Sequence, residues 1–169
     1  GGTLTVAQLI DTSTGSSSLG MVTLDSGTTV ALTSDGDITS SGAVSLTAAS
    51  GISIAGDITT TNDNVTFVSA TTLSGAVAIS TGSGAGTIAF NSTLNGTQDL
   101  LLTVGTGNID FDGAVGDVNR LGILTIVSAT NVTVDSTLAA ASIIQQAGSG
   151  LTTFTGAVNT DTAAGVNIS

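Results

Sequence analysis

The chain repeats a short apolar pair about every 21 residues, and this repeat restricts the folds open to it more than any other feature. The pair appears in NVTF at 64–67, TIAF at 87–90 and NIDF at 108–111, each time as two apolar residues separated by one other residue. On this basis the sequence divides into units at 1–20, 21–42, 43–63, 64–86, 87–107, 108–130, 131–150 and 151–169. A period of this length is typical of solenoids, in which each repeat forms one coil of a stack.

Aligning the units places all four phenylalanines of the protein in one column. The first apolar position of the pair contains Val22, Val44, Val65, Ile88, Ile109, Val132 and, as an exception, Thr152. The second contains Leu24, Leu46, Phe67, Phe90, Phe111, Val134 and Phe154. Between them lie Thr23, Ser45, Thr66, Ala89, Asp110, Thr133 and Thr153. Because successive side chains of a strand point to opposite faces, we expect both apolar columns to face inward and the column between them to face outward.

The residue types favour strands over helices. The chain lacks Glu, Lys and Pro, and its apolar positions are filled largely by Val, Ile, Leu and Phe in alternation with Thr and Ser. The segment LAAASIIQQA at 138–147 has some helical character, but its surroundings favour a strand with a small-residue turn. Each unit also has a later apolar pair: Val30 with Leu32, Ile52 with Ile54, Val77 with Ile79, Leu100 with Leu102, Leu124 with Ile126, Ile143 with Ile144, and Val166 with Ile168.

These observations predict an all-β fold, a parallel β-helix (β-solenoid) of about eight coils with a period near 21 residues. Stacked coils would place like residues about 4.8 Å apart, and asparagines at the turns could form hydrogen-bonded ladders. We expect residues 1–169 to be a single solenoid segment without a signal peptide at its start. Neither end has a polar capping element, so we expect a longer repeat array or an end-to-end polymer.

The charge balance excludes several kinds of partner. The net charge is −11, all twelve acidic residues are Asp, and Arg120 is the only basic residue. Nucleic acid and anionic membrane surfaces both require Lys and Arg, so neither is expected as a partner. The apolar runs are too short for membrane insertion. Arg120 is expected to pair with a nearby carboxylate such as Asp117.

One stretch resembles the repeats of large bacterial surface proteins. TIAFNSTLNGTQDLLLTVGTGNIDFDGAVG at 87–116 follows the phrase GxIxFxGxVxGxxxLTxxxGxGxVxFxGxVG, and TFTGAVNTDTAAGVNIS at 153–169 begins it again. This phrase is similar to that of filamentous-haemagglutinin-like adhesins and related β-strand-repeat exoproteins, with a closer match over 64–169 than over 1–63. The resemblance implies a right-handed parallel β-helix, an extracellular or cell-surface location, and a role as stalk, adhesin or fibre.

The sequence offers little material for catalysis or cofactor binding. Without His or Cys it lacks the usual nucleophile–base pairs and zinc ligands, so we predict no catalytic, cofactor-binding or metal site. The carboxylate pairs Asp110/Asp112 and Asp35/Asp37 are interpreted as solvated acidic faces. Calcium near Asp110, Asp112 and Asp135 is the alternative, because Asp112 and Asp135 would be neighbours in adjacent coils and would repel each other without a cation. The glycine-rich segments at 82–86 and 105–107 are interpreted as turns.

The sequence therefore favours a structural or adhesive, non-enzymatic module of a bacterial fibre. Its expected partners are further copies of itself and a host or neighbouring cell surface or matrix glycan. An ice-binding solenoid is the first alternative, because Thr23, Thr66, Thr133 and Thr153 share an outward column that Ala89 and Asp110 interrupt. A polysaccharide-degrading β-helix is the second, although the chain lacks the basic residues that would hold an acidic polymer.

Overall fold

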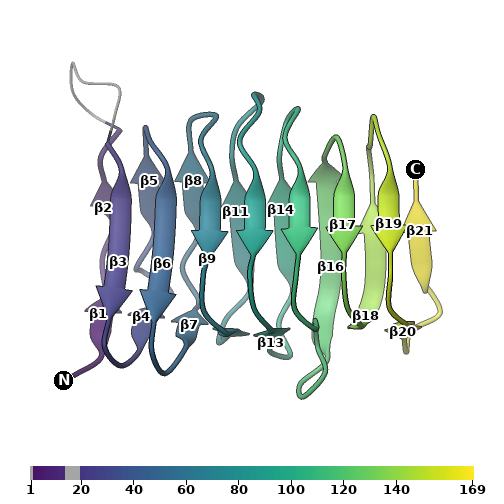
Figure 1. The fold of residues 1–169 in the computed structure, drawn as a ribbon, viewed down its shortest axis with the longest axis horizontal. Helices are drawn as coiled ribbons and strands as arrows, with labels where there is room; N and C mark the ends of the chain where they lie inside the picture. Colours follow the sequence, from purple (N-terminus) through teal and green to yellow (C-terminus); the bar gives the residue numbers. More distant parts are fainter. Residues whose placement is uncertain (1, 14–19) are drawn as a thin grey trace.

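The chain forms a β-solenoid of stacked parallel coils (Figure 1). The computed structural model describes residues 2–13 and 20–169, and within these residues there is no helix. About seven turns with a period of about 22 residues follow one another from the N-terminal to the C-terminal end. The predicted fold class is confirmed. The estimate of about eight coils counted residues 1–20 as a full unit, of which the described part contributes β1 (Leu4–Val6) and β2 (Ile10–Asp11).

Three parallel sheets form the walls of the solenoid, and each coil supplies strands to them in turn. The first sheet contains the strands that open the units, which are β3 (Val22–Ser26), β6 (Val44–Ala48), β9 (Val65–Phe67), β12 (Ile88–Phe90), β15 (Ile109–Phe111), β17 (Val132–Val134) and β19 (Thr152–Phe154). The second contains β1, β4 (Val30–Leu32), β7 (Ile52–Ile54), β10 (Thr71–Leu73) and β13 (Leu94–Asn95). The third begins with β2 and continues with β5 (Ile38–Ser40), β8 (Ile58–Thr60), β11 (Val77–Ser80), β14 (Leu100–Thr103), β16 (Leu121–Ser128), β18 (Leu138–Gln145), β20 (Val158–Thr160) and β21 (Val166–Ile168).

The first sheet has the register that the sequence columns predict. Both apolar columns pair in order from β3 to β19, and the intervening column of Thr23 to Thr153 pairs with them. Phe67, Phe90 and Phe111 stack inside the tube with ring centroids 4.5 and 5.3 Å apart and interplanar angles of 4°. Phe154 lies in the same column, opposite Val134, and is only partly buried. The column prediction is therefore confirmed.

The later apolar pairs belong to two different walls. Val30 and Leu32 pair with Ile52 and Ile54 in the second sheet. Val77 and Ile79 instead pair with Leu100 and Leu102 in the third sheet, which then continues to β16, β18 and β21. The coils thus have up to three inward-facing segments. The later apolar pair seen in the sequence is the second segment in some units and the third segment in others.

The second and third walls merge near the C-terminal end. β18 is a single strand of eight residues, and it confirms that 138–147 is a strand up to Gln145. Its first half pairs with β20 and its second half with β21. The preceding coil contains an extra loop at 116–120, because Val115 lies opposite Leu138 while Leu121 lies opposite Ala140.

One inward position of the third sheet contains a polar residue. Gln145, rather than Ile144, continues the inward column after Ile126, and it is buried. The hydroxyl of Thr152 donates a hydrogen bond of 2.7 Å to Oε1 of Gln145. Thr152 is the exception in the first apolar column, so the two polar residues satisfy each other.

Hydrogen bonds between equivalent turn residues hold the corners of successive coils together. Nδ2 of Asn131 donates to Oδ1 of Asn108 at 3.1 Å, and Oδ1 of Asn131 accepts the N–H of Leu151 at 2.9 Å. These contacts form the expected asparagine ladder. Among the described residues, every buried side-chain nitrogen and oxygen has a hydrogen-bond partner. Side-chain hydrogen bonds therefore connect the turns of adjacent coils, in addition to the packing of the core.

Candidate functional site

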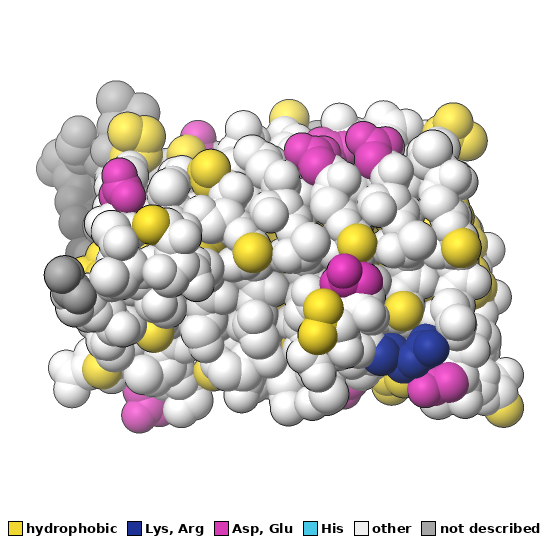
Figure 2. All heavy atoms as spheres, turned by 60° about the horizontal axis from the view of Figure 1, so that its bottom comes forward, with side chains coloured by type: hydrophobic (Ala, Val, Ile, Leu, Met, Phe, Trp, Pro, Cys, Tyr) yellow, Lys and Arg dark blue, Asp and Glu magenta, His cyan; other side chains and the backbone are white. Residues whose placement is uncertain are grey.

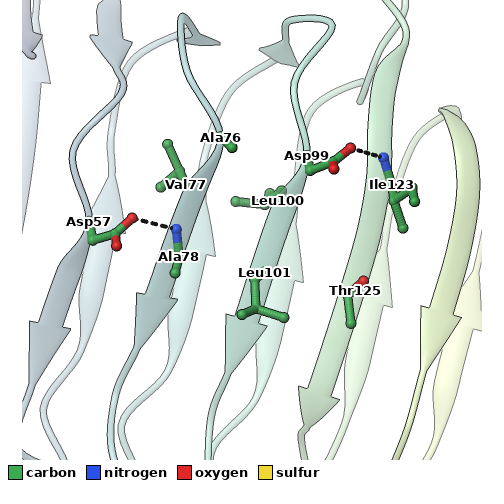
Figure 3. A pocket seen from close by; sticks show the side chains of 9 residues that line it. All are labelled: Asp57, Ala76, Val77, Ala78, Asp99, Leu100, Leu101, Ile123 and Thr125. Atoms are coloured by element: carbon green, nitrogen blue, oxygen red, sulfur yellow. Dashed lines mark hydrogen bonds between the residues drawn. The ribbon is translucent and has the colours of Figure 1, made fainter. Parts of the chain in front are cut away.

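The outer surface of the third sheet contains a shallow groove of about 410 Å³ (Figure 3). It crosses the strands from the start of β8 to β16, and the residues that shape it are Asp57, Ala78, Asp99, Leu101, Ile123 and Thr125. Ala78 pairs with Leu101, and Leu101 with Thr125, so one outward column forms the floor. The hollow arises because Ala78 fills less space than its neighbours in that column. No sequence signal singled out this groove.

Two carboxylates border the groove in equivalent orientations. Oδ1 of Asp57 accepts the N–H of Ala78 at 2.8 Å, and Oδ1 of Asp99 accepts the N–H of Ile123 at 2.7 Å (Figure 3). Asp37 makes the same kind of contact one coil earlier, with the N–H of Asp57 at 2.8 Å. Each Asp side chain therefore links its coil to the next. Asp37, one member of the Asp35/Asp37 pair, thus has a structural role. Asp57 and Asp99 are nevertheless exposed and able to meet a ligand.

The three aspartates considered for calcium lie on the outside of the first sheet. Asp110 faces outward beside Thr133, while Phe111 is buried and Asp112 is exposed. Asp112 and Asp135 follow equivalent strand ends, and their N–H groups bond the carbonyls of Phe90 and Phe111, each at 3.0 Å. No group of three or more acidic, His or Cys side chains within residues 2–13 and 20–169 is arranged to hold a metal ion.

The surroundings of Asp110 raise the pKa of its carboxyl above the ordinary value of 3.8. Desolvation is the largest cause, and the charges of Asp112 and Asp135 act in the same direction, while a hydrogen bond with Thr133 opposes them. A carboxyl whose pKa is higher in the folded state favours folding at low pH. That contribution is lost as the pH rises from about 3.8 through the folded-state pKa, and at neutral pH the ionised group opposes folding.

Replacing Asp110 with asparagine is therefore expected to stabilise the fold at pH 7. The gain in the free energy of unfolding should be about 0.2–1 kcal/mol, the size of a cross-strand charge effect. The hydrogen bond with Thr133 should be kept, because the asparagine amide retains an acceptor oxygen. Urea unfolding at pH 7 and at pH 4 measures it, and the gain should shrink at the lower pH. Asp25→Asn makes the same charge change on the same sheet, beside Thr47. An equal gain in that control would contradict this explanation.

Arg120 binds across two coils, and its predicted partner was wrong. Its Nε lies 3.3 Å from Oδ2 of Asp161, not beside Asp117. Nη1 donates to the carbonyls of Ala140 at 3.1 Å and Asn159 at 2.7 Å, and Nη2 donates to Oδ1 of Asn159 at 2.9 Å. The cation lies against an acidic side chain near the C-terminal end in Figure 2.

The loop at 116–120 explains why Arg120 points along the stack. Gly116 has a φ of 70°, a left-handed conformation that favours glycine. Oδ1 of Asn95 accepts the N–H groups of Val118 and Asn119 at 2.9 and 3.1 Å, which fixes the loop to the preceding coil. Arg120 at the end of the loop then extends toward the coils that follow.

Truncating Arg120 to alanine is expected to loosen the last coil locally. Hydrogen bonds to charged groups contribute about 1.5–3 kcal/mol, and partial exposure places this group at the lower end, so amide protection in β20 and β21 should fall about tenfold. Hydrogen exchange measures this. Arg120→Lys retains the charge without the forked geometry and should give an intermediate loss. Unchanged amide protection in Arg120→Ala would contradict the inference that Arg120 holds the last coil in place.

The remaining sequence motifs have structural roles. The glycine-rich segment at 82–86 forms a turn in which the Thr81 hydroxyl donates to the carbonyl of Gly86 at 2.9 Å, and the segment at 105–107 is also a bend. In the part of the chain that the structure describes, no helix is long and apolar enough to cross a membrane. Comparisons with protein-family models, with curated proteins and with solved structures found no match to this chain.

Proposed function

We propose that the chain is a structural and adhesive, non-enzymatic module of a bacterial cell-surface or extracellular fibre. In this role the stacked coils form a stiff rod, and further coils extend it, either in the same chain or from another copy. The outer walls of the rod would contact a host or neighbouring cell surface or matrix glycan. The observation that carries the proposal is the regular parallel stacking of the coils, in which each coil covers the inward-facing side chains of its neighbours.

Inward-facing side chains lose their cover at both ends of the stack. At the C-terminal end Val158 and Val166 are 36% and 47% exposed, whereas Leu138 and Ile143, which precede them in the same columns, are each 1% exposed. At the N-terminal end Ile10 is only partly buried, while Ile38 in the same column is 1% exposed. Among residues 2–13 and 20–169, the strands at both ends of the sheets pair on one side only, an arrangement that favours addition of one more coil.

Association of the 169-residue chain tests this proposal. Sedimentation and electron microscopy should reveal concentration-dependent end-to-end species. Introducing Val166→Lys and Ile168→Lys in the last coil should suppress them, because charged residues oppose strand addition. Leu101→Lys, on the side wall, serves as the matched control and should leave association unchanged. A chain that stays monomeric at high concentration would count against both routes of extension.

Ice binding is the second candidate, supported by the outward threonines. Thr23, Thr66, Thr133 and Thr153 lie in one register column of the first sheet, and Thr39 pairs with Thr59 in the third. Ala89 and Asp110 interrupt the longer column, which disfavours a regular match to an ice lattice. We expect no thermal hysteresis. A clear difference between the melting and freezing temperatures of ice in a solution of the protein would favour ice binding over the fibre proposal.

A further inference from the structure

The groove on the third sheet has an apolar floor that the core does not require. Leu101 and Ile123 lie on the outside of the solenoid wall, where they are 40% and 39% exposed, and both are aliphatic. Some outward positions elsewhere on this sheet are polar, such as Thr59, which pairs with Ser80, and Ile144, which pairs with Thr125, is a further apolar one. Two exposed aliphatic side chains beside the hollow at Ala78 therefore provide a small surface on which an apolar ligand group could be desolvated.

The carboxylates at the rim are held in place before any ligand arrives. The backbone N–H groups of Ala78 and Ile123 fix one oxygen each of Asp57 and Asp99, at 2.8 and 2.7 Å. The other oxygen of each has no donor among the described residues. A ligand cation would therefore meet two oriented acceptors without paying for their ordering.

The charge of the chain excludes a second copy as the source of that cation. The net charge is −11 and the sole basic side chain is Arg120. Its guanidinium already contacts Asp161, Ala140 and Asn159. Anionic polymers would be repelled for the same reason. The occupant must therefore supply positive charge together with an apolar group.

The composition of the floor favours a peptide over a sugar. Sugar rings commonly stack on aromatic side chains, and three of the four phenylalanines are buried inside the tube while Phe154 lies in the last coil. Leu101 and Ile123 suit aliphatic side chains instead. We propose that the groove binds a short extended segment of a basic partner protein, with cationic side chains on Asp57 and Asp99 and an aliphatic side chain between them.

The spacing of the coils sets the ligand pattern. Asp57 is in register with Leu101, two strands away, and Asp99 lies two residues before Leu101, so the two aspartates are about 12 Å apart, measured diagonally over the sheet. Four residue steps of extended chain span about 13 Å. Because alternate side chains of an extended segment share one face, a segment with Lys or Arg at positions i and i+4 and an aliphatic residue at i+2 matches the groove.

A five-residue peptide tests the assignment on the whole chain. Acetyl-Lys-Ser-Leu-Ser-Lys-amide, titrated into isotopically labelled protein, should shift the NMR signals of Leu101, Ile123 and Ala78, with a Kd of about 0.1–1 mM that weakens with added salt. Asp57→Asn with Asp99→Asn should weaken binding about fivefold, since asparagine retains the oxygen that accepts the backbone N–H. Asp25→Asn removes charge from another sheet and should change binding less than about twofold.

Leu101→Ser removes part of the floor without altering either carboxylate, and it should also weaken binding. The proposal is overturned if the shifts spread over all aspartates, if Asp25→Asn weakens binding as much as the double variant, or if acetyl-Gln-Ser-Leu-Ser-Gln-amide binds equally well. Tighter binding of a glucosamine oligomer than of the peptide would overturn the choice of a protein partner. The inference rests on the adhesive part of the proposed function. Because the peptide test is independent of end-to-end association, the two can fail separately.

Discussion

Replacing Phe90 with alanine is expected to lower the free energy of unfolding by about 3–5 kcal/mol, the usual cost of truncating a buried aromatic residue. Phe90 is 1% exposed and lies between the rings of Phe67 and Phe111, at centroid distances of 4.5 and 5.3 Å. The substitution leaves a cavity in the middle of the tube and removes both stacking contacts. Urea unfolding followed by far-UV circular dichroism measures the loss.

Phe154→Ala is the matched control for this prediction. Phe154 occupies the same column, but it is only partly buried and pairs with Val134 instead of another ring. Its truncation should cost less than half as much as that of Phe90. Equal losses would mean that the stack contributes no more than ordinary burial at the end of the solenoid.

Replacing Gly107 with alanine is expected to destabilise the chain by about 1–3 kcal/mol or more, as overpacking does in a close-packed interior. A Cβ at Gly107 would collide with the carbonyl oxygen of Gly86 in the preceding coil. The carbonyl of Gly107 also accepts the N–H of Thr130 at 2.7 Å, so a backbone shift there would disturb both neighbouring coils. Thermal or urea unfolding gives the change in stability.

Gly27→Ala provides the comparison, because a Cβ at Gly27 would have no atom within 4 Å. That variant should remain within about 0.5 kcal/mol of the parent chain, as surface substitutions usually do. If both glycine variants were equally stable, close approach of the coils at Gly86 and Gly107 would not be a constraint on the fold.

The first wall of the solenoid could be predicted residue by residue, and the other two could not. Strict alternation and the phenylalanines fixed the column from Leu24 to Phe154, and all its members pair as expected. The pairs Val30/Leu32 and Val77/Ile79 have similar residues but lie on different walls. Turn lengths vary between coils, so residue type alone does not distinguish the second wall from the third.

The groove and the contacts of Arg120 depend on features that no local pattern contains. Asp57, Leu101 and Ile123 come together only through the register of the third sheet. Asp161 lies far from Arg120 in sequence, and the pair forms because the Arg120 side chain reaches past Ala140 of the next coil to Asn159 and Asp161. The adjacent apolar residues Ile143 and Ile144 give no alternation to follow, and only the register of the continuous strand β18 shows that Gln145 lies in the inward column.

Distances between spin labels on the outward column of the first sheet test the central claim most directly. The chain has no cysteine, so pairs introduced at Thr23/Thr133 and Thr23/Thr153 would be labelled uniquely. Five and six strand spacings separate these positions, so pulsed electron resonance should give distances of about 24 and 29 Å. A regular increase of about 5 Å from one coil to the next would agree with a single tube of stacked parallel coils. A distance for Thr23/Thr153 equal to or shorter than that for Thr23/Thr133 would contradict it.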